Sequence, residues 1–196
     1  MKRTYSKLLD ADFYDMPTVD VARALLGKIL IHETVEATTA GRIVEVEAYL
    51  AHDDAACHAA RGQTARNAPM FGLPGTAYVY LIYGIHHCFN VVTGQVGEGE
   101  AVLIRALEPL LGLTTMADRR GTSVLKKIAV GPGNLCCALA INRKHNGHNL
   151  QKYPLYLTED GFQARDIITT TRIGISVATA LPLRFYLAAN PFISRK

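Results

Sequence analysis

The sequence predicts a single α+β domain over residues 1–196, with an antiparallel-rich, curved sheet, surrounding helices and a protruding β-hairpin. The length suits one domain with a sizeable core, and 49% of the residues are hydrophobic while 19% are charged. Neither an internal repeat nor a linker divides the chain. Short β-prone segments follow one another while the helical stretches cluster, which favours an α+β domain over a doubly wound sheet.

Hydrophobic spacing predicts the first elements of this domain. Thr18 can cap a helix in which apolar residues recur at helical spacing, and Gly27 ends it. Residues 28–32 are predicted to form a strand. In the next predicted strand, Gly41–Leu50, alternation separates an apolar face from a face with two carboxylates and a phenol. The apolar face holds Val44, Val46, Ala48 and Leu50, and the other face holds Ile43, Glu45, Glu47 and Tyr49.

The remaining elements follow from β-prone and turn-forming residues. Residues 52–74 are dense in Asp, Gly, Asn, Pro and Ala and form a predicted loop. Tyr78–Ile82 and residues 85–92 form a predicted hairpin that turns at Tyr83-Gly84. The pattern also predicts strands at 101–107, 172–177 and 183–187, and helices around 110–120 and 134–141.

Composition excludes several classes of protein. The formal net charge of +4 is compatible with a polyanionic partner but does not require one. The four cysteines show no CxxC spacing, which argues against a disulfide framework and against an iron–sulfur cluster. No apolar run is long enough to span a bilayer, and residues 1–7 are not followed by the apolar core of a secretory signal. We therefore expect an intracellular protein without a membrane partner.

Two charged side chains interrupt otherwise apolar strands. Glu47 is costly to desolvate unless it is paired or used in chemistry, although a glutamate at a strand edge can simply face water. Arg105 lies within Ala-Val-Leu-Ile-Arg-Ala-Leu. It points into a polar pocket, or it forms a structural salt bridge with Glu45 or Glu108. The sequence alone leaves both pairs of interpretations open.

The run Tyr78–Gly84 concentrates aromatic residues. Tyr78 and Tyr80 share one face of the predicted strand, and such residues usually belong to a core. Tyr83 lies at the turn, beside a glycine, where an aromatic ring is harder to bury. It could therefore act as a wedge or stacking platform for nucleic acid.

Two groups of residues raise the question of a metal ion. They are His52-Asp53-Asp54 with His58, and His86-His87 with Cys88. No zincin or deaminase signature is present, and adjacent histidines on a strand point to opposite faces. We predict no metal site and no cofactor.

The segment Gly41–Leu50 resembles the active-site strand of the alkyladenine (3-methyladenine) DNA glycosylase family, the methylpurine-DNA glycosylases. Further motifs match that family in order, from about Phe13 to the C-terminus. They are His58, Gly62–Asn67, Met70-Phe71, Pro74-Gly75-Thr76, Tyr78–Gly84, Asn90, Arg105–Leu110, Gly131–Cys136 and Leu183–Tyr186. Each motif is weak alone, but the ordered set is highly specific.

The resemblance implies roles at a catalytic site and a base pocket. Glu47 would be the general base that activates the attacking water, and His58 and Arg105 would hold that water or position Glu47. Tyr49 and His58 would sandwich the extruded base, with Tyr80 as a further wall of the pocket.

The resemblance also implies roles in selectivity and DNA insertion. Asn90 would disfavour the exocyclic amino group of guanine. Tyr83 would enter the minor groove, and Ile85 would lie beside it where methionine is common in the family. Residues 177–182 lack the charge expected ahead of the Leu183–Tyr186 strand, so phosphate contacts there differ from the family pattern.

The resemblance therefore implies a monofunctional DNA glycosylase of base excision repair, which hydrolyses the N-glycosidic bond of alkylated or deaminated purines (the 3-methyladenine, hypoxanthine and ethenoadenine class) flipped from duplex DNA. No lysine occurs between Gly41 and Arg105, so the amine that a Schiff-base lyase needs is missing from this span. We expect a monomer whose partner is double-stranded DNA with damaged purines, in the cytoplasm of a bacterium or the nucleus of a eukaryote. The rival hypotheses are a non-catalytic nucleic-acid-binding module and a metal-dependent hydrolase that uses the 52–58 cluster.

Overall fold

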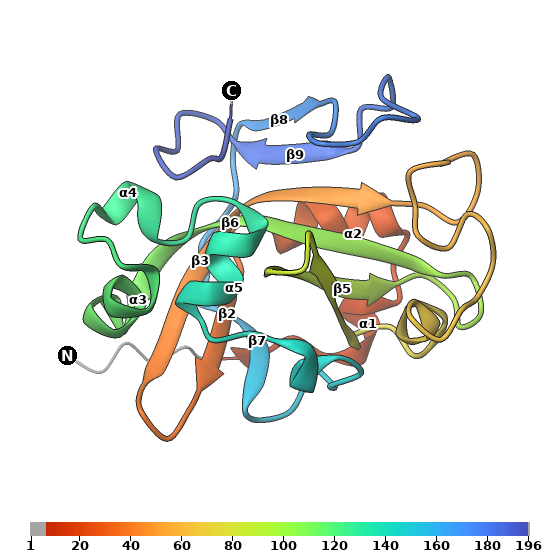
Figure 1. Cartoon of the computed structure of the whole chain (residues 1–196). Helices are drawn as coiled ribbons and strands as arrows, with labels where there is room; N and C mark the ends of the chain where they lie inside the picture. The colour runs from red at the N-terminus through yellow and green to blue at the C-terminus, as the bar shows by residue number, and fades with distance from the viewer. Residues whose placement is uncertain (1–6, 196) are drawn as a thin grey trace.

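One antiparallel sheet organises the chain. The computed structural model describes residues 7–195, and nine strands of this part form a sheet in the order β1-β7-β2-β3-β6-β5-β4, with β9 also paired to β3 and β8 to β9 (Figure 1). The strands are β1 (Lys7–Leu8), β2 (Ile29–Glu33), β3 (Thr38–Tyr49), β4 (Ala77–Ile82), β5 (His86–Thr93), β6 (Glu100–Leu111), β7 (Leu155–Glu159), β8 (Ile167–Thr170) and β9 (Arg184–Leu187). All pairings are antiparallel, so the predicted α+β class is confirmed.

Short helices cover the sheet. They are α1 (Ala11–Tyr14), α2 (Thr18–Leu25), α3 (Leu113–Arg120), α4 (Leu125–Ile128) and α5 (Pro132–Ala138), with 3-10 turns η1 (Ala68–Phe71) and η2 (Arg143–His145). Helix α2 contacts β3 and β6, and α5 contacts β5 and β6. Figure 1 shows α2 behind the long strand β6 and α5 in front of it. None of the helices between residues 7 and 195 combines the length and apolarity that crossing a bilayer requires.

The core has a large and a small part. The larger cluster joins Val21 and Leu25 of α2 to buried residues of the central strands, such as Val46 and Ile104. A smaller cluster lies between the loop after β3 and strands β4 to β6, and includes Met70 and Tyr78. The smaller cluster supports the aromatic side chains of the site described below.

Strand β3 departs from simple alternation. Val46 and Ala48 lie in the main core and Glu45 and Glu47 are on the other face, as predicted. The prediction that Ile43 shares the face of the two glutamates is wrong, because Ile43 and Val44 both lie in the main core. The pairing of β3 with β6 shifts register between Ile43 and Glu45, and such a bulge changes which face the following residues use.

Two further predictions are corrected in the second half. The predicted strand at 172–177 is wrong, because this segment has no strand pairing. Gly174 has a φ of +80° there, and the N–H of Ile173 donates to a side chain instead of to a neighbouring strand. The predicted helix at 110–120 begins only at Leu113, because β6 continues to Leu111 and Gly112, with a φ of +75°, ends it.

A pair of histidines, the buried His32 and the partly buried His145, predicts pH-dependent stability. His32 and His145 lie with their Nε2 atoms 3.1 Å apart, and His32 Nδ1 lies 2.5 Å from the carbonyl oxygen of Leu139. Burial lowers the pKa of both histidines, and Arg119 lowers that of His32 further. Below the ordinary histidine value of about 6.5, the unfolded chain binds more protons than the folded one, so stability falls as the pH falls.

The expected result is a melting temperature that drops between pH 7 and pH 5, and drops less in His145→Gln. The matched control is His52→Gln in an exposed loop, which should keep the wild-type slope. Thermal unfolding at a series of pH values measures it. Equal slopes in all three proteins would contradict the role of the pair.

Candidate active site

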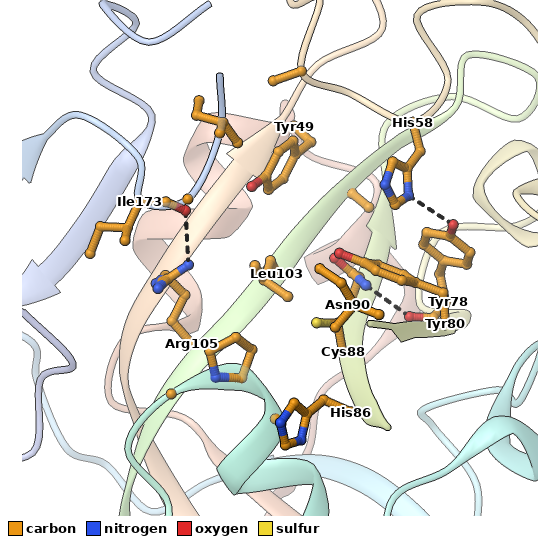
Figure 2. A pocket seen from close by; sticks show the side chains of 18 of the residues that line it. Tyr49, His58, Tyr78, Tyr80, His86, Cys88, Asn90, Leu103, Arg105 and Ile173 are labelled. Carbon is orange, nitrogen blue, oxygen red and sulfur yellow. Dashed lines mark hydrogen bonds between the residues drawn. The ribbon is translucent and has the colours of Figure 1, made fainter. Parts of the chain in front are cut away.

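A cavity of about 420 Å³ opens on the face of the sheet that carries the polar residues of β3. Strands β3 to β6 supply much of its walls, and the rest comes from residues 131–134 and 173–175, from Ala56, His58 and Met70 after β3, and from Tyr83 at the β4–β5 turn. Figure 2 shows Tyr49 and His58 on two sides of the cavity, with Arg105 and Ile173 on the side away from His58. The cavity has the size of a typical small-molecule site.

Strand alternation explains why these side chains converge. On β4, Tyr78 and Tyr80 are two residues apart and both line the cavity, as do Cys88 and Asn90 on β5. Pairing places Tyr80 opposite Cys88, and Tyr78 opposite Asn90. Asn90 in turn pairs with Leu103 of β6, another cavity residue. One continuous surface of the sheet therefore forms the floor and one wall of the cavity.

Glu47 lies at the edge of this cavity with no solvent exposure. Three groups hold its carboxylate. The hydroxyl of Tyr49 donates to Oε2 at 2.9 Å, the N–H of Ile173 donates to Oε1 at 2.7 Å, and the guanidinium of Arg105 forms an ion pair with Oε2 at 3.2 Å. All three residues line the cavity, whereas Glu47 lies behind them. Burial, followed by the charge of Glu47, raises the pKa of Tyr49, so the phenol keeps the proton that it donates.

Arg105 joins the two carboxylates of β3. Its Nε lies 3.5 Å from Glu45 Oε1, in addition to its contact with Glu47. Glu45 is also fully buried, and it accepts from Arg184 Nε at 2.7 Å and from the N–H and hydroxyl of Ser194 at 2.6 and 2.9 Å. Both interpretations of Arg105 thus hold: it lines the pocket and forms a structural ion pair with Glu45.

His58 belongs to an aromatic wall. Its Nδ1 lies 3.0 Å from the hydroxyl of Tyr78, and its ring lies 4.6 Å from that of Tyr80, measured between centroids. The side chain amide of Asn67 donates to the backbone carbonyl of His58 at 2.8 Å, which anchors the loop. The recorded contacts of His58 are with this wall and not with Glu47, so the structure does not bring it to the carboxylate.

Proton positions on this wall follow from burial. Burial raises the pKa of Tyr78 to about 12, so its hydroxyl stays protonated. His58 is open to the cavity, but the surrounding protein still reduces its hydration, and this, followed by the charge of Arg66, lowers its pKa. A neutral imidazole that accepts from Tyr78 at Nδ1 carries its proton on Nε2.

Asn90 is buried at the floor of the cavity. Its Nδ2 donates to the backbone carbonyl of Tyr78 at 3.0 Å. Burial raises the pKa of the neighbouring Tyr80, and Cys88 raises it further. These groups are neutral, so the aromatic end of the cavity is uncharged while the opposite end carries Arg105.

The β4–β5 turn projects two apolar side chains into solvent. Tyr83 is 82% exposed and Ile85 is 72% exposed. Tyr83 also borders the cavity and has a left-handed φ of +53°. A Cβ built on Gly84 would meet no atom within 4 Å, so the tip is free of the rest of the molecule. The predicted exposed aromatic tip is confirmed.

The candidate metal ligands have other surroundings. Within residues 7–195 no group of three or more His, Cys, Asp or Glu side chains is arranged to hold a metal ion. Asp54, the buried member of the 52–58 group, instead forms an ion pair with Arg172.

The sequence did not predict Arg172 and Ile173 as site residues, since its pattern assigned them to a strand. The only signal was an arginine ahead of Ile-Gly-Ile, and its partner lies 118 residues away.

The fold and the site together define a class of protein. A buried carboxylate with several donors, beside a cavity with aromatic walls and an exposed aromatic tip, suits a hydrolase whose substrate carries a flat ring.

The chain belongs to the methylpurine-DNA glycosylase family, whose sequence model matches residues 12–191. It is accordingly a DNA glycosylase, a DNA-repair enzyme that hydrolyses the N-glycosidic bonds of alkylated purines. A protein of Methanoculleus marisnigri is 53% identical over 192 residues, covering 96% of this chain and 99% of its own. One of Carboxydothermus hydrogenoformans is 48% identical over 191 residues, covering 96% and 100%. Both bear the name "putative 3-methyladenine DNA glycosylase".

Proposed function

We propose that the chain is a monofunctional glycosylase that flips alkylated or deaminated purines of the 3-methyladenine, hypoxanthine and ethenoadenine class out of duplex DNA and hydrolyses their N-glycosidic bonds with water activated by Glu47. The observation that carries the proposal is the fully buried Glu47 carboxylate, held by three groups that line the cavity. These three groups fix the orientation of the carboxylate, so it can act as a general base on a water molecule bound at one defined position.

The proposed water site lies where Arg105 and Ile173 meet. These two cavity-lining residues both touch Glu47, and the guanidinium Nη1 of Arg105 lies 3.5 Å from the carbonyl oxygen of Ile173. A water there would donate to Glu47 and to the carbonyl and accept from Arg105. Its oxygen would then be directed at a sugar carbon when the base fills the cavity. His58, which contacts the aromatic wall, is not part of the proposed water site.

The proposed base site lies between Tyr49 and His58, with Tyr80 as a further wall. Stacking on aromatic side chains is worth about 1–3 kcal/mol per base. It favours an electron-poor alkylated purine, which is also a good leaving group. Asn90 would disfavour the exocyclic amino group of guanine, and the bond from its Nδ2 to the carbonyl of Tyr78 holds its amide in place.

The absence of a suitable amine supports hydrolysis without lyase activity. No lysine is present among the described residues that line the cavity, and a Schiff base needs an amine nucleophile. We further propose that the protein acts as a monomer on double-stranded DNA inside the cell, in the compartment that holds the DNA.

A base-release assay on a panel of damaged duplexes tests the proposal. We expect free 3-methyladenine, hypoxanthine or ethenoadenine and an intact abasic strand, with the same rate in the presence of EDTA. Lesion binding without release would favour the non-catalytic binding module. A rate lost with EDTA and restored by a divalent metal would favour the metal-dependent hydrolase.

Tyr83→Ala tests the proposed insertion into DNA. We expect lesion binding and excision on duplex DNA to weaken by about 5- to 150-fold, the equivalent of about 1–3 kcal/mol for one aromatic stack. Excision from single strands should change less, because no gap in a base stack has to be filled. Tyr83→Phe keeps the ring and should keep most of the activity. Equal losses on duplex and single strands would contradict a wedge.

A further inference from the structure

Asp54 and Arg172 form an ion pair with no solvent exposure on either side chain. Arg172 Nη1 lies 2.5 Å from Asp54 Oδ2 and Nη2 lies 2.6 Å from Oδ1, so two parallel bonds join them. Nη1 also donates to the backbone carbonyl of Ala48 at 3.0 Å. Neither Asp54 nor Arg172 lines the cavity, so neither can touch the substrate there.

This pair ties two loops to the strand that carries Glu47. The carboxylate of Asp54 accepts from the N–H groups of Leu50 and Ala56 at 3.1 and 3.2 Å, which shapes the turn that follows β3. The guanidinium of Arg172 lies 4.6 Å from the centre of the Tyr49 ring. Tyr49 is both a wall of the cavity and a donor to Glu47.

The residue after Arg172 makes the shortest contact with Glu47. Ile173 donates its N–H to Oε1 at 2.7 Å, and no strand pairing holds the segment at 172–177 in place. The neighbouring Gly174, with its left-handed φ of +80°, adds no constraint from a side chain. The position of the Ile173 backbone therefore depends on how Arg172 is held.

A buried ion pair is weak evidence for a contribution to stability, because the desolvation of both charges offsets their attraction. We propose that Asp54 and Arg172 are positioning residues that fix the Ile173 backbone, and thereby the orientation of the Glu47 carboxylate in the attack of water. The proposal rests on the proposed role of Glu47. When the pair of Asp54 and Arg172 is broken, Glu47 Oε1 loses the N–H of Ile173 as its donor. The ionised form of the buried Glu47 carboxylate is then less stable relative to the protonated form.

Few other titratable groups act on Glu47. Those that interact with it are Tyr49, Cys88, Arg105 and Arg172, and Glu45 shares Arg105. Burial raises the pKa of Tyr49 and of Cys88, so neither changes its charge at acidic pH. The acid limb of the pH–rate profile then reports on this carboxylate and on His58 of the cavity wall, and of these two groups only the carboxylate is tied to Arg172 through the N–H of Ile173.

Arg172→Lys is the main test, because it keeps the positive charge but cannot form two parallel bonds. The matched control is Arg42→Lys. Arg42 also makes two bonds to one carboxylate, that of Asp160, and one to the backbone carbonyl of Gly27, but it contacts no group of the cavity.

In single-turnover base release, we expect Arg172→Lys to be at least 10-fold slower than Arg42→Lys, with lesion binding unchanged and the acid limb moved to higher pH. Asp54→Asn should move the limb in the same direction. A purely electrostatic effect of Asp54→Asn would move it to lower pH, because a negative charge is removed.

A rate and a pH profile of Arg172→Lys that match those of Arg42→Lys would overturn the inference. So would an acid limb that moves to lower pH in Asp54→Asn. If one variant fails to fold, the other decides by the same criteria. Failure of the proposed function is a different result, since the wild-type protein would then release no base from any duplex.

Discussion

Glu47→Gln is expected to slow base release by about 10²- to 10⁴-fold, the usual contribution of a positioned acid–base group. Glutamine has nearly the same shape, and its single oxygen can keep the N–H of Ile173 as a donor, while its amide N–H can donate to the hydroxyl oxygen of Tyr49. It cannot take a proton from water. Arg105 keeps its second carboxylate partner, Glu45, so the fold should survive.

Single-turnover release from a lesion-containing duplex measures this effect, and a binding assay on the same duplex provides the control. We expect lesion binding to be kept, because the aromatic walls of the cavity are unchanged. A variant with full activity would remove Glu47 from the mechanism. Loss of binding together with activity would indicate a structural role instead.

Glu45→Gln is expected to have the largest effect on stability, about 3–5 kcal/mol in the free energy of unfolding. Glu45 is fully buried, and two guanidinium groups, those of Arg184 and Arg105, share its Oε1. Removal of its charge leaves Arg184 without a carboxylate partner and Arg105 with Glu47 alone, in a buried region. The N–H and the hydroxyl of Ser194 donate to different oxygens of Glu45, and glutamine keeps only one of these two acceptors.

Urea unfolding measures the loss, and Glu36→Gln provides the comparison. Glu36 also pairs with an arginine, Arg119, at 3.0 Å, but its side chain is 71% exposed. Exposed ion pairs contribute little, so this control should unfold close to the wild-type midpoint. Similar midpoints for the two variants would show that the Glu45 cluster is not a structural anchor.

The local sequence pattern was sufficient to predict those parts of the site whose residues lie on a single strand. Alternation along β3 placed Glu45 and Glu47 on one face, and the glycine after Tyr83 placed that ring at an exposed turn. In each case the side chain direction follows from the strand itself. The chemistry of the residues then indicated which face carries the site.

Contacts between distant segments could not be predicted in this way. The pairing of Arg172 with Asp54 spans 118 residues, and nothing near Arg172 marks it as buried. The alternation around Ile173 resembles that of a strand, but its N–H is committed to Glu47. Strands β7 and β8 were also missed, because each is short and is defined by its partners.

The sheet separates the parts of the enzyme that must stay fixed from those that can vary. Strand β3 is bonded on both sides where it carries Glu47, to Leu103 of β6 and to Arg184 of β9. Within residues 7–195, strand β4 lies at the end of the sheet and has β5 as its single strand partner. Substitutions on β4 are therefore expected to change the lining of the proposed base site while the strand pairing around Glu47 is left undisturbed, which makes this edge the natural starting point for engineering new lesion preferences.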